Sequence, residues 1–173
     1  DILPTENVFE IAKNDGQDIV KLESFNDYLL VYKTSDLFIF DVSGTTDILV
    51  KTFYGKGISS ENHVVKTDNN IISMNANGIY AFDGETIQDV ISDKIDPEFY
   101  QKYLSGSGSK LFHEPQQNLL IISSKYDSLA STERTDGAVT SEYYHRYGFI
   151  LNLSTGALFY KNNFLMSNYF YKI

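Results

Sequence analysis

The chain has 173 residues, a formal net charge of −9, a hydrophobic content of 42%, and no Cys or Trp. This length suffices for one well-formed core, and the lack of Cys excludes both a disulfide framework and a thiolate metal site. The acidic charge argues against a surface that grips nucleic acid, because such a surface needs Lys and Arg to neutralise phosphates.

The first part of the chain is predicted to be a lead-in segment followed by two units of four strands. Residues 1–17 show no clear hydrophobic period and end in the turn residues Asn14-Asp-Gly16. Runs rich in Ile, Val, Leu, Phe and Tyr then predict a first unit, at about 18–54, with strands at 19–25, 28–32, 37–41 and 48–53. A second unit, at about 55–104, is predicted to have strands at 63–67, 70–74, 78–82 and 86–91.

One constant offset relates these two units. Phe38-Ile-Phe-Asp41 aligns with Tyr80-Ala-Phe-Asp83 after a shift of 42 residues (80 − 38). The same shift places residues 27–31 on 69–73 and residues 48–49 on 90–91. A period in the forties with several short strands in each unit is typical of a β-propeller blade. The sequence therefore predicts an all-β fold of consecutive four-stranded antiparallel blades.

A structural repeat motif, Gly-Ile-Tyr-Ala-Phe-Asp-Gly at 78–84, carries the clearest turn signals. Gly78, after Asn77, predicts a tight hairpin, because both residues tolerate the positive φ that such a turn needs. Tyr80 and Phe82 belong to the strand that follows. Asp83 and Gly84 are predicted to close the next turn in the same way.

A short helix is predicted at 97–104, because Asp96 suits its N-cap and Pro97 its first position. A third unit, at about 105–173, follows with predicted strands at 110–113, 119–124, 147–152 and 157–162. Asn152 ends its third strand, where Asp41 and Asp83 stand in the other units. Each of these side chains is predicted to bond its own backbone and start a turn, which argues against a ring of catalytic carboxylates.

A polar insertion from Lys125 to Arg146 separates the second and third strands of the third unit. A loop of this length inside a compact domain is usually functional or disordered. Its last residues, Tyr143, Tyr144, His145 and Arg146, are aromatic and basic, and Tyr and Arg are enriched in interface hot spots. They are candidates for contact with a partner. The alternative is that they extend the next strand as one arm of a hairpin.

No constellation typical of an active site is found. His63, His113 and His145 lie in different units and lack the spacing of metal ligands. The glycine loops at 55–57 and 105–110 lack the spacing of a phosphate-binding loop, and there is no nucleophile elbow. We therefore expect no enzyme activity, no metal and no cofactor.

The stretch from Gly55 to Gly84, followed by Ile91-Ser-Asp-Lys-Ile95, resembles the β-propeller proteins of bacteriophage tails and necks. These are the DNA-stabilisation, nozzle and muzzle types of short-tailed and crAss-like phages. The shared pattern is a Gly-x-Gly-x-x-Ser opening, a Gly-Ile-Tyr-x-Phe-Asp-Gly motif and an Ile-Ser-Asp-x-Ile step before a short helix. The resemblance covers residues 55–104 directly and the flanking units through the repeat. It implies a structural role in the virion, with assembly surfaces in place of an active site.

Three units are too few to close a propeller, which typically has four to eight blades. We therefore expect about three consecutive blades of a larger propeller that surrounds the genome exit channel of a phage tail or neck. The expected location is the virion tail, and the host cytoplasm during assembly. The expected partners are other tail or neck proteins and copies of the chain in a ring. DNA is expected to pass nearby at most without being gripped, and no membrane is expected to take part.

Two alternatives stay open. The chain fits a carbohydrate- or receptor-binding propeller module on a tail tip or cell surface, in which turns rich in Tyr, Asn and Asp form the site. The net charge of −9 either lines an acidic channel that repels DNA or serves solubility alone.

Overall fold

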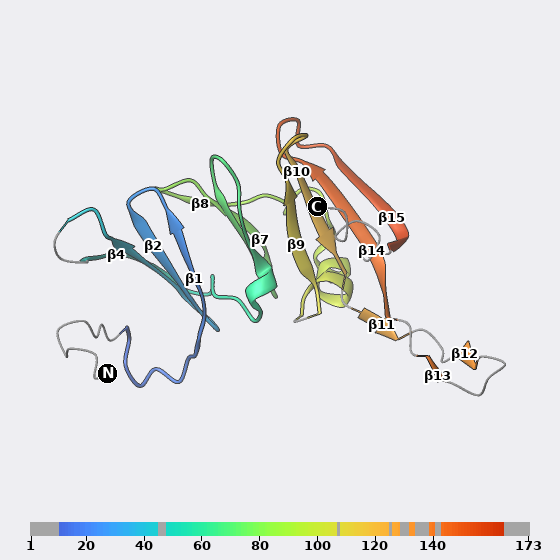
Figure 1. Ribbon diagram of the computed structural model, residues 1–173, viewed down its shortest axis with the longest axis horizontal. Helices are drawn as coiled ribbons and strands as arrows, with labels where there is room; N and C mark the ends of the chain where they lie inside the picture. Colours follow the sequence, from blue (N-terminus) through green and yellow to red (C-terminus); the bar gives the residue numbers. More distant parts are fainter. Residues whose placement is uncertain are drawn as a thin grey trace.

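The computed structural model describes residues 11–44, 48–106, 108–124, 126–128, 132–133, 139–140 and 143–164. Of residues 126–128, 132–133, 139–140, 143–147 and 161–164 it describes the backbone. Within these ranges the chain is mostly β, with three larger antiparallel sheets and one short helix. The sheets stand in a row along the long axis of the molecule, in sequence order (Figure 1). The described helices are all too short to cross a membrane.

Sheets 1 and 2 are meanders in which each strand pairs with the next. Sheet 1 contains β1 (Ile19–Phe25), β2 (Tyr28–Lys33), β3 (Leu37–Asp41) and β4 (Ile48–Phe53). Sheet 2 contains β5 (Val64–Lys66), β6 (Ile71–Asn75), β7 (Gly78–Phe82) and β8 (Ile87–Asp89). Leu29 pairs with Phe40 and, 42 residues later in both strands, Ile71 pairs with Phe82. The offset found in the sequence is therefore also the offset of the strand register.

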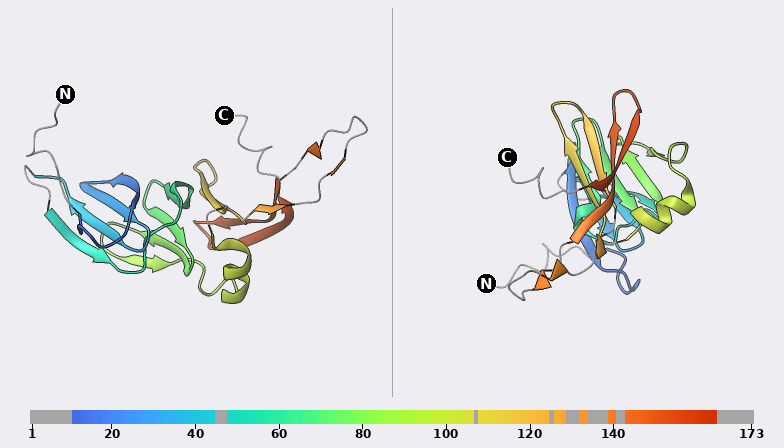
Figure 2. Two further views of the ribbon diagram at one scale, coloured as in Figure 1. Left: turned by 90° about the horizontal axis from the view of Figure 1, so that it is seen from below. Right: turned by 90° about the vertical axis from the view of Figure 1, so that its right-hand side faces the viewer.

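Sheet 3 has the same strand order with an extension. It contains β9 (Lys110–Glu114), β10 (Leu119–Ser123), β11 (Tyr126–Ser128), β14 (Tyr143–Asn152) and β15 (Leu158–Phe164). β11 continues β10 in one register, because Ser123 pairs with Gly148 and Tyr126 pairs with His145 on the same strand, β14. Farther out, β12 (Thr132–Glu133) pairs with β13 (Val139–Thr140). These strands form an arm that projects from the end of sheet 3 and away from the row of sheets (Figures 1 and 2).

Both faces of sheet 2 are buried. We call the face of a sheet that points toward the preceding sheet in chain order its backward face, and the opposite face its forward face. In sheet 1 the backward face is the one that points away from sheet 2. The backward face of sheet 2 carries Val64, Ile71 and Phe82 in one core cluster with residues of sheet 1, including Leu30, Tyr32, Leu37 and Ile39. The forward face carries Ile72, Met74 and Ile79 in a second cluster with residues of sheet 3, including Leu111, Leu120, Ile122, Phe149 and Leu151. Burial on two faces explains why neighbouring residues such as Ile71 and Ile72 are both apolar, although their side chains point to opposite faces.

The short helix packs between sheets 2 and 3. It begins with α1 (Pro97–Phe99), where Asp96 Oδ1 accepts a hydrogen bond from Phe99 N at 3.0 Å, and continues as a π-helical turn, Tyr100–Leu104. Tyr100 and Leu104 are buried in the second core cluster. Phe99 packs against the same cluster as a partly buried residue.

Each strand predicted for the three units is present, with ends that differ by a few residues. The largest difference is β14, predicted at 147–152 and found at Tyr143–Asn152. In the described parts of the polar insertion, β11 pairs with β14 and β12 pairs with β13, and the last residues of the insertion lengthen β14. The described strands do not close into a barrel.

Candidate functional site

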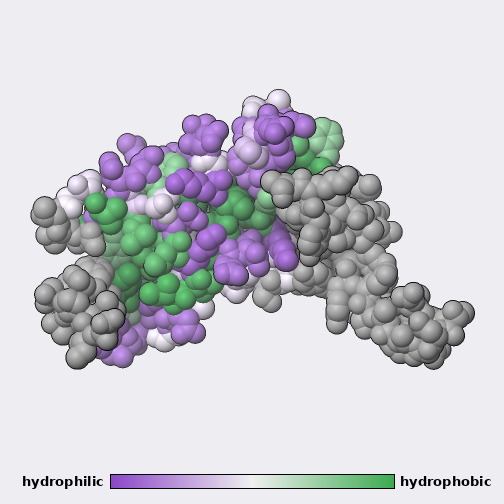
Figure 3. Space-filling view, in the orientation of Figure 1, coloured by the Kyte–Doolittle hydropathy of each residue, from purple (hydrophilic) through white to green (hydrophobic). Residues whose placement is uncertain are grey.

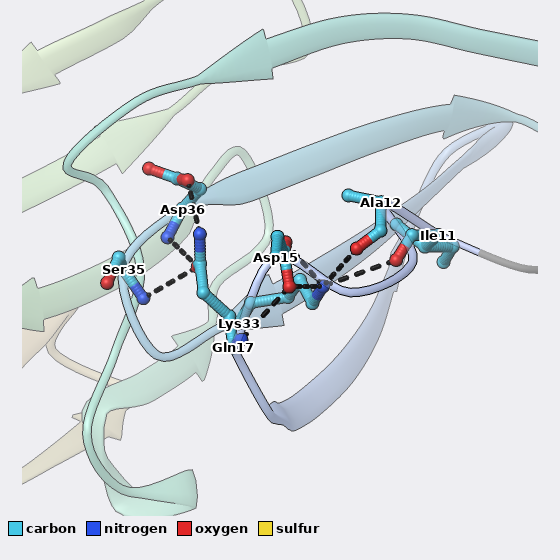
Figure 4. A network of polar contacts seen from close by, with 7 residues as sticks. All are labelled: Ile11, Ala12, Asp15, Gln17, Lys33, Ser35 and Asp36. Atoms are coloured by element: carbon cyan, nitrogen blue, oxygen red, sulfur yellow. Dashed lines mark hydrogen bonds and ion pairs between the residues drawn. The ribbon is translucent and has the colours of Figure 1, made fainter.

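Lys33, at the end of β2, anchors the segment that precedes sheet 1 (Figure 4). Its side chain is 4% exposed, and its Nζ lies 2.7 Å from Asp15 Oδ2. Nζ also donates hydrogen bonds to two backbone oxygens of the same segment, at 3.2 and 3.3 Å. The hydrogen bond from Lys33 lowers the pKa of Asp15. The buried cation is thus paired and hydrogen-bonded, which is the arrangement of a structural anchor and not of a reactive lysine.

Asn75, 42 residues after Lys33, has the corresponding place in sheet 2. Its Nδ2 donates hydrogen bonds to the backbone oxygens of Gly55 at 2.9 Å and Gly57 at 3.2 Å. Gly57 N in turn donates to Ser35 O at 2.7 Å, and the next backbone N–H donates to Lys33 O at 3.0 Å. A Cβ on Gly57 would lie 2.3 to 2.4 Å from backbone atoms of the β2–β3 turn, so a side chain has no room. This glycine loop therefore serves close packing between sheets 1 and 2.

Tyr100 joins sheet 2 to the helix that leads into sheet 3. Its hydroxyl lies 2.6 Å from Asn75 O and 2.9 Å from Gly78 O, both in the β6–β7 turn. Burial raises the pKa of Tyr100, so the hydroxyl remains a hydrogen-bond donor. Sheets 1 and 2 therefore share one kind of contact, in which the segment that leads to the next sheet holds a turn. The glycine loop holds the β2–β3 turn of sheet 1, and Tyr100 holds the β6–β7 turn of sheet 2.

Gly78 occupies the predicted hairpin, but the expected positive φ is not found. Neither Asn77 nor Gly78 has a positive φ. A Cβ at position 78 would lie 2.9 Å from Asp89 Oδ2 and 3.0 Å from the hydroxyl of Tyr80, so the ends of these two side chains would have to shift to admit it. Tyr80 is buried, and Lys56 Nζ lies 3.4 Å from the centroid of its ring, within the range of a cation–π contact. Burial raises the pKa of Tyr80 and lowers that of Lys56.

The remaining motif residues have packing and turn roles. Phe82 lies at the centre of the first core cluster, and its ring makes edge contacts with the rings of Phe25, Tyr28 and Phe53 at centroid distances of 6.2, 6.4 and 6.1 Å. Gly84 has a φ of +106°, a conformation that glycine adopts without strain.

Asp41, Asp83 and Asn152 occupy equivalent turns at the ends of the third strands. Asp41 Oδ1 accepts a hydrogen bond from the backbone N of Ser43 at 2.9 Å. Asp83 Oδ1 accepts two backbone hydrogen bonds, at 2.8 and 2.7 Å, and Asn152 Oδ1 also accepts two, both at 3.0 Å. Backbone hydrogen bonds in these turns lower the pKa of Asp83, and the hydrogen bonds from Ser43 lower the pKa of Asp41. An amide oxygen accepts these bonds as well as a carboxylate does, which explains why the third unit has Asn at this position.

The three histidines are not brought together. His63 is buried beside sheet 3, where its Nδ1 lies 3.4 Å from Ser59 Oγ. The backbone of Gly106 and Ser109 lies beside its ring, but Nε2 makes no well-formed hydrogen bond among the described residues. Burial lowers the pKa of His63, so the neutral form is favoured. His113 Nε2 lies 3.2 Å from Asn118 Oδ1, and the backbone of His145 belongs to β14. Among the residues that the structure describes, no group of three or more His, Asp or Glu could hold a metal ion.

The predicted contact residues lie in the arm. The backbone of Tyr143, Tyr144, His145 and Arg146 forms the first part of β14, and residues 143–145 pair with β11. The strand extension considered from the sequence is therefore present. Contact with a partner stays a prediction, because the side chains of these residues lie outside the described part.

An open groove between the helix and β15 is the clearest candidate binding site. It measures about 750 Å³ and is lined by Lys94, Ile95, Asp96, Phe99, Phe149, Gly156, Leu158 and Tyr160. The Phe99 ring meets the Phe149 ring edge-on at a centroid distance of 5.8 Å, and Phe149 lies 6.2 Å from Tyr160. Tyr160 is 70% exposed, so its ring forms an open wall of the groove. We call this site the aromatic groove.

The aromatic groove and the anchoring contacts between sheets were not predicted from the sequence. Phe149 and Tyr160 face each other because they are paired in register on β14 and β15, and Phe99 reaches them from the helix. The period of two along a strand shows which side chains of 147–152 share a face. It does not show that the helix places Phe99 beside Phe149 and that Tyr160 stays exposed.

Comparisons with known proteins identify no family. No model of a known protein family matches the chain. A search of curated proteins finds no significant match.

Proposed function

We propose that this chain forms three consecutive blades of a larger β-propeller that serves as a structural, non-catalytic component of a phage tail or neck. The resemblance of residues 55–104 to tail propellers supports the assignment to a phage. The repeated packing of the three sheets supports the propeller.

The observation that carries the proposal is a pair of residues in the same position of every sheet. Leu30 pairs with Ile39 in sheet 1, and this pair packs forward onto sheet 2. The equivalent pair in sheet 2 is Ile72 and Ala81, which packs forward onto sheet 3. Two sheet junctions thus use one register, as successive blades of a propeller do.

Sheet 3 carries the same forward pair, Ile121 and Ile150. These residues form a separate small cluster with Phe112, and no further large sheet among the described residues packs against them. Phe159, the next residue of this face, is 62% exposed. Sheet 1 also has exposed apolar residues on its backward face, where Leu22 is 56% and Leu49 is 48% exposed. Apolar residues gather on the surface over this sheet (Figure 3). Both faces suit further blades, which would bury this apolar surface.

The first strands lie at the centre of the proposed ring. Lys21 of β1 donates a hydrogen bond to Val64 O at 3.0 Å, and Lys66 of β5 donates one to Ser24 O at 2.7 Å, so these strands are tied side by side. The three first strands carry Lys at three positions and Glu at two, without Asp. The acidic charge of the chain is therefore not concentrated on them, which favours solubility as its role over an acidic channel lining.

The proposed partners are other tail or neck proteins and copies of the chain in a ring, within the virion and, before that, in the host cytoplasm. Mass spectrometry of purified virions tests this function. We expect peptides of this chain at a stoichiometry of several copies per particle. Complete absence from virions, with other tail proteins detected, would overturn it.

A further inference from the structure

We infer that the aromatic groove binds a pyranose ring of a neutral glycan. This inference does not rest on the proposed role in a virion, because it follows from the groove alone. It gives a site to the carbohydrate-binding alternative, which the sequence placed in turns rich in Tyr, Asn and Asp.

The first argument is the aromatic wall. Phe149 and Tyr160 point to the same face of sheet 3, and Tyr160 leaves 70% of its surface exposed. The Tyr160 ring, next to the rings of Phe149 and Phe99, therefore offers a flat apolar surface that a ligand can reach. A pyranose presents a flat face of C–H groups, which stacks on such a ring, and hydroxyl groups at its rim.

The second argument is the polar rim on the opposite side of the groove. Lys94 and Asp96 both line the groove and provide one donor and one acceptor of opposite charge. Asp96 Oδ1 already accepts the helix-capping bond from Phe99 N, and Lys94 Nζ lies 2.8 Å from Asp93 Oδ1. Both side chains are thus held in place while keeping further hydrogen-bonding capacity. A sugar hydroxyl can accept from the ammonium and donate to the carboxylate.

The third argument concerns charge and size. Asp93 pairs with Lys94, so together with Asp96 the rim carries one cation and two anions, which disfavours an anionic ligand. A neutral sugar finds both a donor and an acceptor there. A volume of about 750 Å³ lies within the usual range of small-molecule sites and has room for more than one sugar ring.

Binding can be measured with the whole chain and four neutral probes: cellotriose, maltotriose, chitotriose and mannotriose. Because the chain has 13 Tyr and no Trp, a ligand stacked on Tyr160 should change the tyrosine fluorescence, and saturation-transfer NMR gives an independent readout. We expect at least one probe to bind. Tyr160→Ala should weaken that binding by about tenfold or more, the effect of losing one good stacking contact.

Phe159→Ala is the matched control. Phe159 precedes Tyr160 on β15, is 62% exposed and points to the opposite face, so its loss should leave the affinity unchanged. Asp96→Asn keeps a good helix cap but removes the carboxylate, and should weaken binding with an unchanged circular dichroism spectrum. Failure of all four probes, preference for sialylated or sulfated glycans on an array, or equal effects of Tyr160→Ala and Phe159→Ala would each overturn the inference.

Discussion

Replacing Gly57 by alanine tests the close packing between sheets 1 and 2. The new Cβ would lie 2.3 Å from Ser35 C and 2.4 Å from both Asp36 N and Lys33 O. Favourable contacts between heavy atoms need about 3.5 Å, so the connection would have to move by about 1 Å. This shift would break the hydrogen bonds from Gly57 N to Ser35 O (2.7 Å) and from Ile58 N to Lys33 O (3.0 Å).

The expected loss of stability is large for one methyl group. Overpacking costs about 1–3 kcal/mol, and the two hydrogen bonds contribute about 1 kcal/mol each. The free energy of unfolding should therefore fall by about 3–5 kcal/mol, or roughly 6–20 °C in Tm for a chain of this size. Urea unfolding followed by circular dichroism measures the first quantity, and a thermal melt measures the second.

Gly55→Ala is the matched control, two residues earlier in the same loop. Gly55 has a φ of +69°, and a Cβ added to it would have no other atom within 4 Å, so alanine there should cost about 1 kcal/mol of backbone strain. The packing explanation would be refuted if Gly57→Ala destabilised the protein no more than Gly55→Ala.

Three further predictions concern buried polar groups. Tyr100→Phe should lower the free energy of unfolding by about 1–3 kcal/mol, because two backbone oxygens lose their shared donor. Tyr32→Phe should cost less, because the Tyr32 hydroxyl has only a weak contact with the Ser73 side chain and no well-formed hydrogen bond among the described residues; equal losses in urea titrations would contradict this. The pKa of His63 is lower in the folded state than its unfolded value of about 6.5, so the unfolded state binds more protons. The contribution of neutral His63 to the free energy of unfolding should therefore be fully present above that pH and should be lost as the pH falls below it. His63→Gln should flatten this part of the stability–pH curve between pH 7 and 5, and an unchanged slope would show that other groups cause it. Asp15→Asn should destabilise the protein more than Lys33→Met, since it leaves a buried ammonium without its carboxylate; the reverse order in thermal melts would argue against the ion pair as the anchor.

The strands and most turns could be predicted from the sequence by itself, because these depend on neighbours along the chain. Runs rich in Ile, Leu and Phe, such as Leu37–Asp41 and Ile71–Asn75, predicted strands. The offset between Phe38 and Tyr80 predicted a repeated unit, and the strand register repeats with the same offset because a repeated pattern of side chains repeats the pairing. Asp83 could be assigned to a turn because a short carboxylate bonds the backbone two or three residues later in any fold.

The tertiary structure decided the contacts between sheets. Gly57 and Gly78 were recognisable as glycines of turns, but the backbone of a different hairpin fills the space beside Gly57, and the Tyr80 and Asp89 side chains fill that beside Gly78. Nothing in the sequence distinguished Lys33 from the other lysines, whereas the fold places its ammonium against Asp15. The aromatic groove exists because the helix that follows sheet 2 brings Phe99 to Phe149, beside an exposed Tyr160 on β15. Such features depend on the distances between segments far apart in the chain, and periodicity within a strand contains no information about them.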